Sequence, residues 1–583
     1  MYGPYGMVFT SLFASLALIS CLLVYRFIFP KKEINLFVLL VLVSLLPVIS
    51  IFRPGSYQSG DLSLHVTEAI AFYKSLSEGI LIPRWAGNLN ATYGYPAFMF
   101  IYILPYYIIS LFHFIGFSFL DSAKVFLALS FIFSGATMYL WIKDELNELA
   151  GFIAGIFYLF APYHLVDLHF RVDIGEVLAF VFLPLALLLT KKIIEKKSIN
   201  LIVAQGIVFA LLILSHPAVS LASVPLIIAY AIFCKVREKQ KSYKALLLSF
   251  LSLALGILIS AFSWLPTVWD IKYTNQSILS QNIAFPDLSQ FIYSPWRFGL
   301  LFQGPRGELS FVIGYIQIAL IIYALLLIFE GKIRNKKSSL LKFMLGGFVI
   351  YFFMMQSQSQ SLWFIIPFIK NFQFAYRLLF FTSVFTSVIA AYLLYKLKNK
   401  KLIVVICFLA IAITILNWGN RLTIPAINDT YLTKQLPLST AQGEGLTQAE
   451  PIWTDPLHPW IGKIPKNHLE VLNGKADIKQ LSRTVNLHTY SVSIQSSSLM
   501  RENTLYFPGW NLYVNGKHYP TIISKNYPKG VIEFKLPKGN YNISLVFEDT
   551  TIIKASEIIS ILSLLLMLGL LLSPKLNRFR PED

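Results

Sequence analysis

Residues 174–197 read IGEVLAFVFLPLALLLTKKIIEKK, an apolar run that ends in a cluster of lysines. The apolar part, 174–190, is close to the ~20 residues that a membrane-spanning helix requires. Positive residues in short loops between apolar runs mark the cytoplasmic side, so Lys191 and Lys192 predict that this end faces the cytoplasm. Glu176 is an exception within the run, because a carboxylate there requires a partner or a proton.

The composition of the whole chain agrees with a membrane protein. Of 583 residues, 56% are hydrophobic and 14% are charged, whereas soluble domains carry roughly a quarter charged residues. The net charge of +19 lies in short clusters between apolar runs. No contiguous basic face is visible, which argues against a nucleic-acid partner. Cys21, Cys234 and Cys407 fit neither a metal site nor a disulfide framework.

Long apolar runs recur along the chain and predict about thirteen membrane crossings. The candidate spans are 7–29, 34–52, 122–142, 149–164, 174–190, 199–214, 218–234, 244–265, 310–330, 340–357, 375–396, 401–418 and 553–573. A further apolar stretch, 96–117, is predicted to enter the outer leaflet and return. If it crossed, the turn at Lys31 and Lys32 would lie opposite every later basic cluster. The charge rule therefore predicts the N-terminus outside and the C-terminus inside.

This topology divides the chain into three parts. Residues 1–418 are expected to form a transmembrane domain whose outer loop, 53–121, carries the candidate site. Residues 419–552 are expected to form an outer β-rich domain, because the alternation of apolar and polar residues over 484–494 is typical of a strand. Residues 553–583 supply the last span and a cytoplasmic tail. The predicted fold is a polytopic α-helical membrane protein with a C-terminal extracytoplasmic β-sandwich.

The outer loop holds the first group of candidate residues, in the stretch Gly60-Asp61-Leu62-Ser63-Leu64-His65-Val66-Thr67-Glu68. His65 lies one helical turn after Asp61 on the same face, and Glu68 extends the same stripe. The Asp61 carboxylate either caps a helix by accepting backbone N–H bonds or serves as a reactive group. The two interpretations are compatible, since a capping position holds a carboxylate rigidly at the outer surface.

A second group lies between the spans 149–164 and 174–190. Its members are Tyr163, His164, Asp167, His169, Arg171, Asp173 and Glu176. So many titratable groups form either a solvated face or a site. Glu176 favours a site because it lies within the apolar run, and Arg171, His169 and Asp173 are the nearest candidates for its partner. The spacing of the two histidines and Asp167 matches no established metal-ligand pattern.

Outward histidine and arginine residues form a third group. His216 and Pro217 interrupt the apolar run 199–234, as a simple hairpin or as an imidazole at the outer rim of the bundle. Arg377 opens the span 375–396 from the outside, against the charge rule, so it meets either an anionic partner or lipid headgroups. Further outward arginines are Arg84, Arg297 and Arg306. Together these arginines could hold a phosphate or pyrophosphate through forked hydrogen bonds.

The order of several motifs along the chain resembles one family. The motifs are Gly60-Asp61, His65, GILIPRW at 79–85, YGYPAF at 93–98, LPYY at 104–107, Ala161-Pro162-Tyr163, Arg171, Glu176, Ser215-His216-Pro217, Phe372-Gln373-Phe374 with Arg377, and YFPGW at 506–510. They resemble bacterial membrane proteins described as 6-pyruvoyl-tetrahydropterin synthase related. Those are similar to YfhO-type proteins, within the GT-C class of membrane glycosyltransferases. The soluble pterin enzyme is a compact zinc protein, and nothing in this sequence supplies its histidine set.

The resemblance implies a transferase that moves a sugar from a polyprenyl-phosphate-linked donor to a cell-envelope acceptor, on the outer face of the bacterial cytoplasmic membrane. In GT-C enzymes an aspartate of the first large outer loop is catalytic, and Asp61 matches it. The related Asp-x-Asp or Glu-x-Asp pair is absent, which leaves the need for a divalent cation open. The expected catalytic residues are Asp61, His65 and Glu176. The expected substrate-binding residues are Arg84, Tyr95, His164, Arg171, His216, Arg306 and Arg377.

Two other functions remain open from the sequence. A flippase or transporter of lipid-linked glycans would usually show internal repeats and paired broken helices, and neither is clear in this chain. A non-catalytic glycan-binding relative would keep the GT-C architecture without its activity, which the missing second acid would explain. Transfer, translocation across a vesicle, or binding alone would separate the three.

Overall fold

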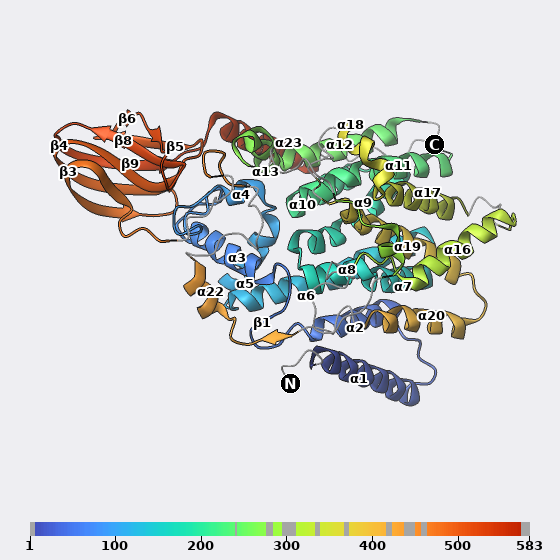
Figure 1. The fold of residues 1–583 in the computed structure, drawn as a ribbon. Coiled ribbons are helices and arrows are strands. Elements are labelled where there is room, and N and C mark those ends of the chain that lie inside the picture. The colour runs from blue at the N-terminus through green and yellow to red at the C-terminus, as the bar shows by residue number, and fades with distance from the viewer. Residues whose placement is uncertain are drawn as a thin grey trace.

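The computed structural model describes residues 6–239, 242–275, 284–293, 310–332, 338–365, 372, 374–415, 422–436, 449–455 and 463–572. Most of these residues form a bundle of helices, and a β-sheet near the end of the chain projects from one end of the bundle (Figure 1). The predicted class, a polytopic α-helical membrane protein with a C-terminal β-rich domain, is confirmed.

The apolar helices coincide with the predicted spans. They are α1 (Gly6–Ile28), α2 (Leu36–Ile49), α6 (Phe119–Glu145), α7 (Glu148–Leu159), α9 (Ile174–Lys196), α10 (Ile199–Ser215), α11 (Pro217–Arg237), α12 (Lys244–Ile259), α16 (Tyr315–Phe329), α17 (Ser339–Met354), α19 (Leu379–Leu394), α20 (Lys400–Ile413) and α23 (Thr551–Leu572). Among the described residues, six helices are long and apolar enough to cross a membrane, or up to nine if each bent pair is one span. The number of thirteen crossings therefore stays a prediction.

One bent pair creates the local geometry of the candidate site. Helix α7 is followed by the short helix α8 (Pro162–Val166) and by a π-helical turn, η1 (Asp167–Arg171), at an angle of 49°. Pro162 stands at the start of α8. A proline is tolerated in the first turn of a helix, where the N–H that it lacks would have no partner, but it prevents α7 and α8 from forming one continuous helix. The chain then reverses through Val172, which has a left-handed φ of 58°, into α9.

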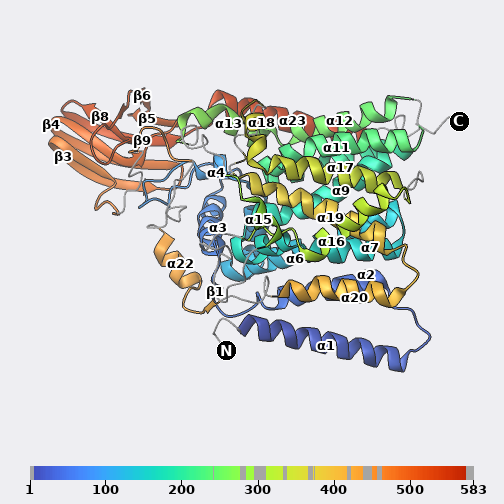
Figure 2. The same cartoon turned by 45° about the vertical axis from the view of Figure 1, so that its right-hand side comes forward.

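The centre of the bundle is α19, whose apolar stretch is 100% buried inside the protein. It packs against α7, α9, α16 and α17. By contrast, α1 lies at the periphery beside α2, and only 6% of its apolar stretch is buried inside the protein (Figure 2). A helix that is hydrophobic all round is stable in either place, in a protein core or against lipid.

Residues 96–117 form two short helices rather than one long helix. They are α4 (Ala97–Phe100) and α5 (Leu104–Phe114), with a break between them. At 1.5 Å per residue, the 11 residues of α5 extend over about 16 Å, half of the ~30 Å hydrocarbon core. Helix α5 packs against α6 and against α3 (Leu62–Ser77) in the outer loop. This length suits a segment that enters the membrane and returns, which stays a prediction.

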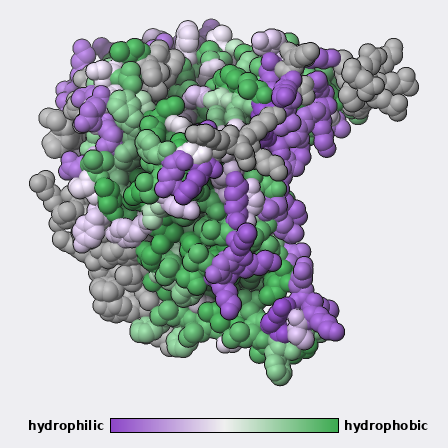
Figure 3. All heavy atoms as spheres, turned by 90° about the vertical axis from the view of Figure 1, so that its right-hand side faces the viewer, coloured by the Kyte–Doolittle hydropathy of each residue, from purple (hydrophilic) through white to green (hydrophobic). Residues whose placement is uncertain are grey.

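Basic clusters that the charge rule assigns to the cytoplasm meet at one end of the bundle. Lys191 Nζ of α9 lies 2.7 Å from Asp144 Oδ2 of α6, and Arg237 Nη1 of α11 lies 2.6 Å from Glu145 Oε2. Figure 3 shows the face on this side, where hydrophilic side chains lie in clusters among broad hydrophobic areas. The arrangement agrees with the predicted orientation of these three helices.

The β-rich domain is a single sheet. Its strands are β3 (Leu469–Arg483), β4 (Leu487–Leu505), β5 (Trp510–Val514), β6 (Lys517–Tyr519), β7 (Ile522–Ile523), β8 (Val531–Leu536) and β9 (Gly539–Phe547). The order is β6-β5-β9-β4-β8-β7, with β3 also paired to β4, and all pairs are antiparallel. The expected sandwich is corrected in this respect: β4 pairs with β9 through its first half and with β8 through its second, so β3 to β9 form one sheet. Apart from it, β1 (Ser56–Tyr57) of the outer loop pairs with β2 (Thr423–Ile424).

The sheet is joined directly to the outer loop. The Leu505 N–H donates to the Tyr93 carbonyl at 3.0 Å, and Arg483 Nη2 donates to the Thr92 carbonyl at 3.1 Å. The Trp85 and Trp510 rings lie 5.4 Å apart, edge to face. The outer loop and the sheet are therefore one connected structure on the same end of the bundle (Figure 1).

Candidate functional site

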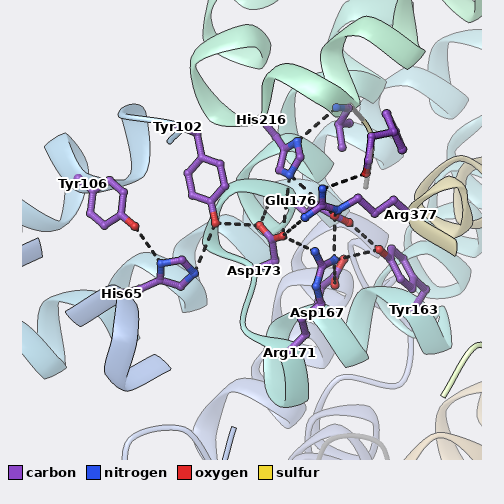
Figure 4. Close-up of polar contacts among 12 residues, drawn as sticks. His65, Tyr102, Tyr106, Tyr163, Asp167, Arg171, Asp173, Glu176, His216 and Arg377 are labelled. Atoms are coloured by element: carbon purple, nitrogen blue, oxygen red, sulfur yellow. Dashed lines mark hydrogen bonds and ion pairs between the residues drawn. The ribbon is translucent and has the colours of Figure 1, made fainter. Parts of the chain in front are cut away.

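A buried ion-pair cluster surrounds the start of α9 (Figure 4). Asp173 is the N-cap of this helix and accepts the Glu176 N–H at 3.0 Å. Arg171 Nη2 lies 2.7 Å from Asp173 Oδ2, and its Nη1 lies 2.8 Å from Glu176 Oε1. The two carboxylates thus share one guanidinium, which explains how the apolar end of α9 accommodates a charged Glu176.

A second arginine reaches the same cluster from a distant part of the chain. Arg377 lies in the short helix η6 (Ala375–Leu378) before α19. Its Nε lies 2.9 Å from Glu176 Oε1 and its Nη2 lies 3.6 Å from Asp173 Oδ2. Tyr163 completes the set, because its hydroxyl donates to Glu176 Oε2 at 2.7 Å. Asp167 is a third buried carboxylate of this cluster, with Oδ1 3.3 Å from Arg171 Nη1, so the two arginines contact three carboxylates inside the protein.

His216 faces this cluster from the turn between α10 and α11. Its Nδ1 accepts the Val219 N–H at 3.2 Å, so the neutral imidazole carries its proton on Nε2. Nε2 lies 3.8 Å from Asp173 Oδ2 and 3.9 Å from Glu176 Oε1. Burial lowers the pKa of His216 to about 4, and Arg377 acts in the same direction while Asp173 opposes it.

A chain of hydroxyl and imidazole groups leads from Asp173 to α3 (Figure 4). The Tyr102 hydroxyl donates to Asp173 Oδ1 at 3.1 Å and lies 3.4 Å from His65 Nε2. His65 Nδ1 lies 3.1 Å from Glu68 Oε2 and 2.9 Å from the Tyr106 hydroxyl. Tyr106 also donates to Glu68. The first and second sequence groups therefore form one network, with Tyr102 between them.

Asp61 stands at the N-cap position of α3, but its side chain makes no capping hydrogen bond. Its backbone is fixed instead: the Gly60 and Asp61 N–H groups donate to the Phe170 and Arg171 carbonyls at 2.7 and 3.0 Å. A Cβ on Gly60 would lie 3.0 Å from the Arg171 carbonyl oxygen, so glycine allows this close approach. The predicted cap position is correct, and the capping bond is absent. The carboxylate is partly exposed and remains available for other contacts.

The charges around Asp61 act in opposite directions. Burial raises the pKa of the Asp61 carboxyl, His65 and Arg171 lower it, and the net effect is a pKa above the ordinary value. Burial also lowers the pKa of His65, but Glu68, Asp61 and Asp173 raise it, and the result is again above the ordinary value. A carboxylate with a raised pKa, next to cationic groups, is typical of acid–base sites.

Of the other expected substrate-binding residues, Arg84 and His164 make their contacts outside this network, whereas Tyr95 acts electrostatically on Tyr106. Arg84 is buried, with Nη2 2.7 Å from Glu557 Oε1 of α23, so it joins the outer loop to the last helix. Tyr95 is buried and its carbonyl accepts the Ala86 N–H. The His164 ring stacks on Phe180 with centroids 3.8 Å apart, and Nδ1 bonds to the Tyr158 carbonyl. Arg297 and Arg306 lie outside the described residues.

The sequence named two acidic residues of the network without giving them a role in the site. Asp173 was a candidate partner of Glu176, three positions before it, and Glu68 extended the stripe of Asp61 and His65 on α3. Tyr102 and Tyr106 gave no such signal, because their partners lie on α3 and α9 and are brought near only by the fold.

A divalent cation does not fit this cluster. Asp173, Glu176 and His216 each offer one ligand atom, and these atoms lie within 4.8 Å of one another. However, the two carboxylates already contact guanidinium nitrogens of Arg171 and Arg377 at 2.7 to 2.9 Å. A cation placed among them would face two fixed positive charges.

The family of the chain follows from a sequence match. The sequence model of the membrane-protein family described as "6-pyruvoyl-tetrahydropterin synthase related domain" matches residues 100–424, more than half of the chain. The chain belongs to this family. The resemblance read from its motifs is thereby confirmed. A protein of Lactococcus lactis subsp. cremoris, described as uncharacterized, is 24% identical over 327 residues, which are 54% of this chain and 52% of the relative. The chain thus spans about half the length of the relative it matches.

Two solved structures are similar to this chain in part. The arabinofuranosyltransferase AftD from mycobacteria is 14% identical, with 67% of this chain and 27% of that chain covered and a TM-score of 0.42. ArnT from Cupriavidus metallidurans, solved with undecaprenyl phosphate, is 15% identical, with 62% and 60% covered and a TM-score of 0.35. At these scores the likeness is partial.

Proposed function

We propose that this membrane protein transfers a sugar from a polyprenyl-phosphate-linked donor to a cell-envelope acceptor on the outer face of the cytoplasmic membrane, with Asp61 as the general base. The observation that carries the proposal is the position of Asp61. Hydrogen bonds fix its backbone against η1, its carboxylate makes no capping bond, and the charge of Arg171 acts on it at one end of an apolar bundle.

The reaction asks for two things that this site supplies. The acceptor hydroxyl gives its proton to the Asp61 carboxylate, and its oxygen forms a bond to the anomeric carbon of the sugar. The bond between that carbon and the phosphate oxygen breaks, and its electron pair stays on the phosphate. Positive charge stabilises the departing phosphate, and Arg171 is the cation that acts on Asp61 most directly after His65.

The surroundings of Asp61 suit a lipid-linked donor and a sugar acceptor. The apolar helices of the bundle provide surface for a polyprenyl chain, and the β-sheet is fixed to the loop that carries Asp61. We infer that the sheet orients the acceptor. Arg377 and Glu176 contribute by holding the cluster together, since their charged groups already pair with each other.

The deciding experiment is transfer from labelled polyprenyl-phospho-sugars by the purified protein in lipid. Asp61→Asn should abolish transfer, because an amide cannot accept the proton, and should leave the protein folded. Asp121→Asn is the matched control: it makes the same change in the first turn of α6, where an exposed carboxylate lies 3.5 Å from Lys124 Nζ, and should retain full transfer. Full transfer by Asp61→Asn would refute the base assignment.

One observation favours a second function, proton-coupled movement of a lipid-linked glycan. Buried titratable groups follow one another from Glu68 through His65 and Tyr102 to Asp173. Such chains in membrane proteins often carry protons. Protein in sealed vesicles separates the two functions. Movement of intact lipid-linked sugar driven by a pH gradient, without a new glycosidic bond, would favour the transporter.

A further inference from the structure

His65 and its hydrogen-bond partners form the most constrained part of the network. The imidazole is buried between three segments. It is faced by Asp61 and Glu68 from the start of α3, by Tyr102 and Tyr106 from the stretch 96–117, and by Asp173 from the start of α9. Each ring nitrogen can donate or accept, depending on where the protons are. The charge states of the neighbours decide between these roles.

The bonds at Nδ1 require a proton on that atom. Glu68 Oε2 lies 3.1 Å from Nδ1, and this oxygen also takes the proton of the Tyr106 hydroxyl, so it acts as an acceptor here. The Tyr106 hydroxyl donates its single proton to Glu68, so at 2.9 Å its oxygen can only accept from Nδ1. Both neighbours therefore take a hydrogen bond from Nδ1–H.

The bond at Nε2 requires a second proton. Asp173 is ionised: burial acts to raise its pKa, but the guanidiniums of Arg171 and Arg377, 2.7 and 3.6 Å from Oδ2, hold it below the ordinary value. The Tyr102 hydroxyl therefore donates to Asp173 Oδ1 at 3.1 Å. Its oxygen is left to accept, and the donor within reach is His65 Nε2 at 3.4 Å. An imidazole with a proton on both nitrogens is an imidazolium.

We infer that Glu68 and Tyr102 hold His65 as a permanent cation one helical turn from Asp61, and that Tyr102 is the positioning residue that links this cation to the Asp173–Arg171 cluster. Its use in catalysis rests on the proposed function: a fixed positive charge would stabilise the departing phosphate and would not orient Asp61 as a base. The charge state itself stands on the hydrogen bonds of His65 and on the ionised Asp173, and it does not depend on transfer activity.

The position of Tyr102 is set by close packing. Its ring lies 5.4 Å from the His216 ring, and a Cβ on Gly175 would lie 2.7 Å from its Cε1 atom. Glycine at the start of α9 therefore leaves the space that the tyrosine fills. Figure 4 shows the hydroxyl pointing between His65 and Asp173.

Carbon-13 NMR of histidine-labelled protein in lipid nanodiscs tests the inference. The protein has nine histidines, and the His65 signal is the one missing in His65→Gln. In the unmodified protein, His65 should keep both protons at pH values where an unperturbed imidazole is neutral. Tyr102→Phe should lower the ratio of imidazolium to imidazole about tenfold at a fixed pH, because it removes one acceptor from the charged form.

Two further variants keep the test decisive. Tyr107→Phe removes a neighbouring hydroxyl that bonds to the Leu81 carbonyl, and it should leave the His65 titration unchanged. Glu68→Gln should also lower the ratio of imidazolium to imidazole at His65. This variant replaces Tyr102→Phe in the test if the tyrosine variant does not fold. A neutral His65 near pH 7, or equal titration in all variants, would overturn the inference. A cationic His65 in a protein without transfer activity would refute the proposed function alone.

Discussion

The Glu176 carboxylate lies against Arg377, with Oε1 2.9 Å from Nε, and both side chains are withdrawn from solvent. The two residues lie far apart in the sequence, so this contact joins α9 to the segment before α19. Removing one member of a buried pair leaves an uncompensated charge, which is far more costly than removing both. Loss of either residue should therefore lower the free energy of unfolding more than loss of one member of an exposed pair.

Single substitutions at this pair should be strongly destabilising. We expect Arg377→Gln and Glu176→Gln each to lower the free energy of unfolding by about 3–5 kcal/mol, and the double variant to lose less than the sum. Unfolding in detergent as a double-mutant cycle measures the coupling. Lys332→Gln is the control, because its pair with Glu330 is exposed, and we expect little measurable loss there. Additive losses at Glu176 and Arg377 would contradict a direct pair.

Replacing Gly175 with alanine should disturb the site by sterics alone. A Cβ there would lie 2.6 Å from the Ser215 carbonyl oxygen as well as against Tyr102. Forcing an extra methyl group into packed structure costs about 1–3 kcal/mol. Gly346→Ala is the matched control, since a Cβ at that position of α17 meets no atom within 4 Å and alanine favours a helix by about 0.5–1 kcal/mol. Equal melting temperatures for the two variants would argue against the close contact at Gly175.

Local patterns in the sequence were sufficient for much of the fold. The apolar runs and lysine clusters predicted the helices, because each depends on residues within one segment. Asn515-Gly516 is another local pattern of this kind, since an Asn-Gly pair favours a tight hairpin turn. Both residues have positive φ, 49° and 78°, and β5 pairs with β6 across them. The predicted β-sandwich is instead a single sheet, because β4 pairs with both β8 and β9. These pairings join separate segments of the sequence, so no local pattern reveals them.

The candidate site was predictable only in part, for the same reason. Asp61, Glu176 and Arg377 stood out because a charge near an apolar run needs a partner. Which partner each one found depends on tertiary packing: Glu176 meets Arg377, whereas Arg84 meets Glu557 on the last helix. The role of Tyr102 as a bridge depends on the break between α4 and α5, and sequence periodicity does not reveal it.

Asp61→Asn should be at least as stable as the unmodified protein at neutral pH. The pKa of Asp61 is raised in the folded state, so the folded protein binds this proton more tightly than the unfolded chain. The resulting cost is absent below the ordinary carboxyl pKa and is present once the pH rises through the folded pKa. The asparagine removes that cost. Unfolding measured from acidic to neutral pH checks this, and a marked loss of stability in the variant at pH 7 would count against it.

The transfer rate should depend on pH through the same group. A base works in its ionised form, so transfer should fall as the pH drops through the pKa of Asp61, which partial burial raises above the usual carboxyl value. The acid limb of the rate profile should therefore begin at a higher pH than for an exposed aspartate. A rate profile that is flat over the acid range would contradict a base at this position.

His216 gives the opposite dependence of stability on pH from Asp61. Its folded pKa is lowered to about 4, below the ordinary value of 6.5, chiefly by burial. Between these values the unfolded chain binds the proton and the folded protein does not, so the stabilisation is complete above pH 6.5 and is lost as the pH falls towards about 4. We expect His216→Gln to remove this part of the acid sensitivity, because glutamine does not titrate. Melting temperatures of the two proteins at pH 7.5 and pH 5 measure the effect: the unmodified protein should lose more on acidification, and an equal loss in both would show that the imidazole is not buried in its neutral form.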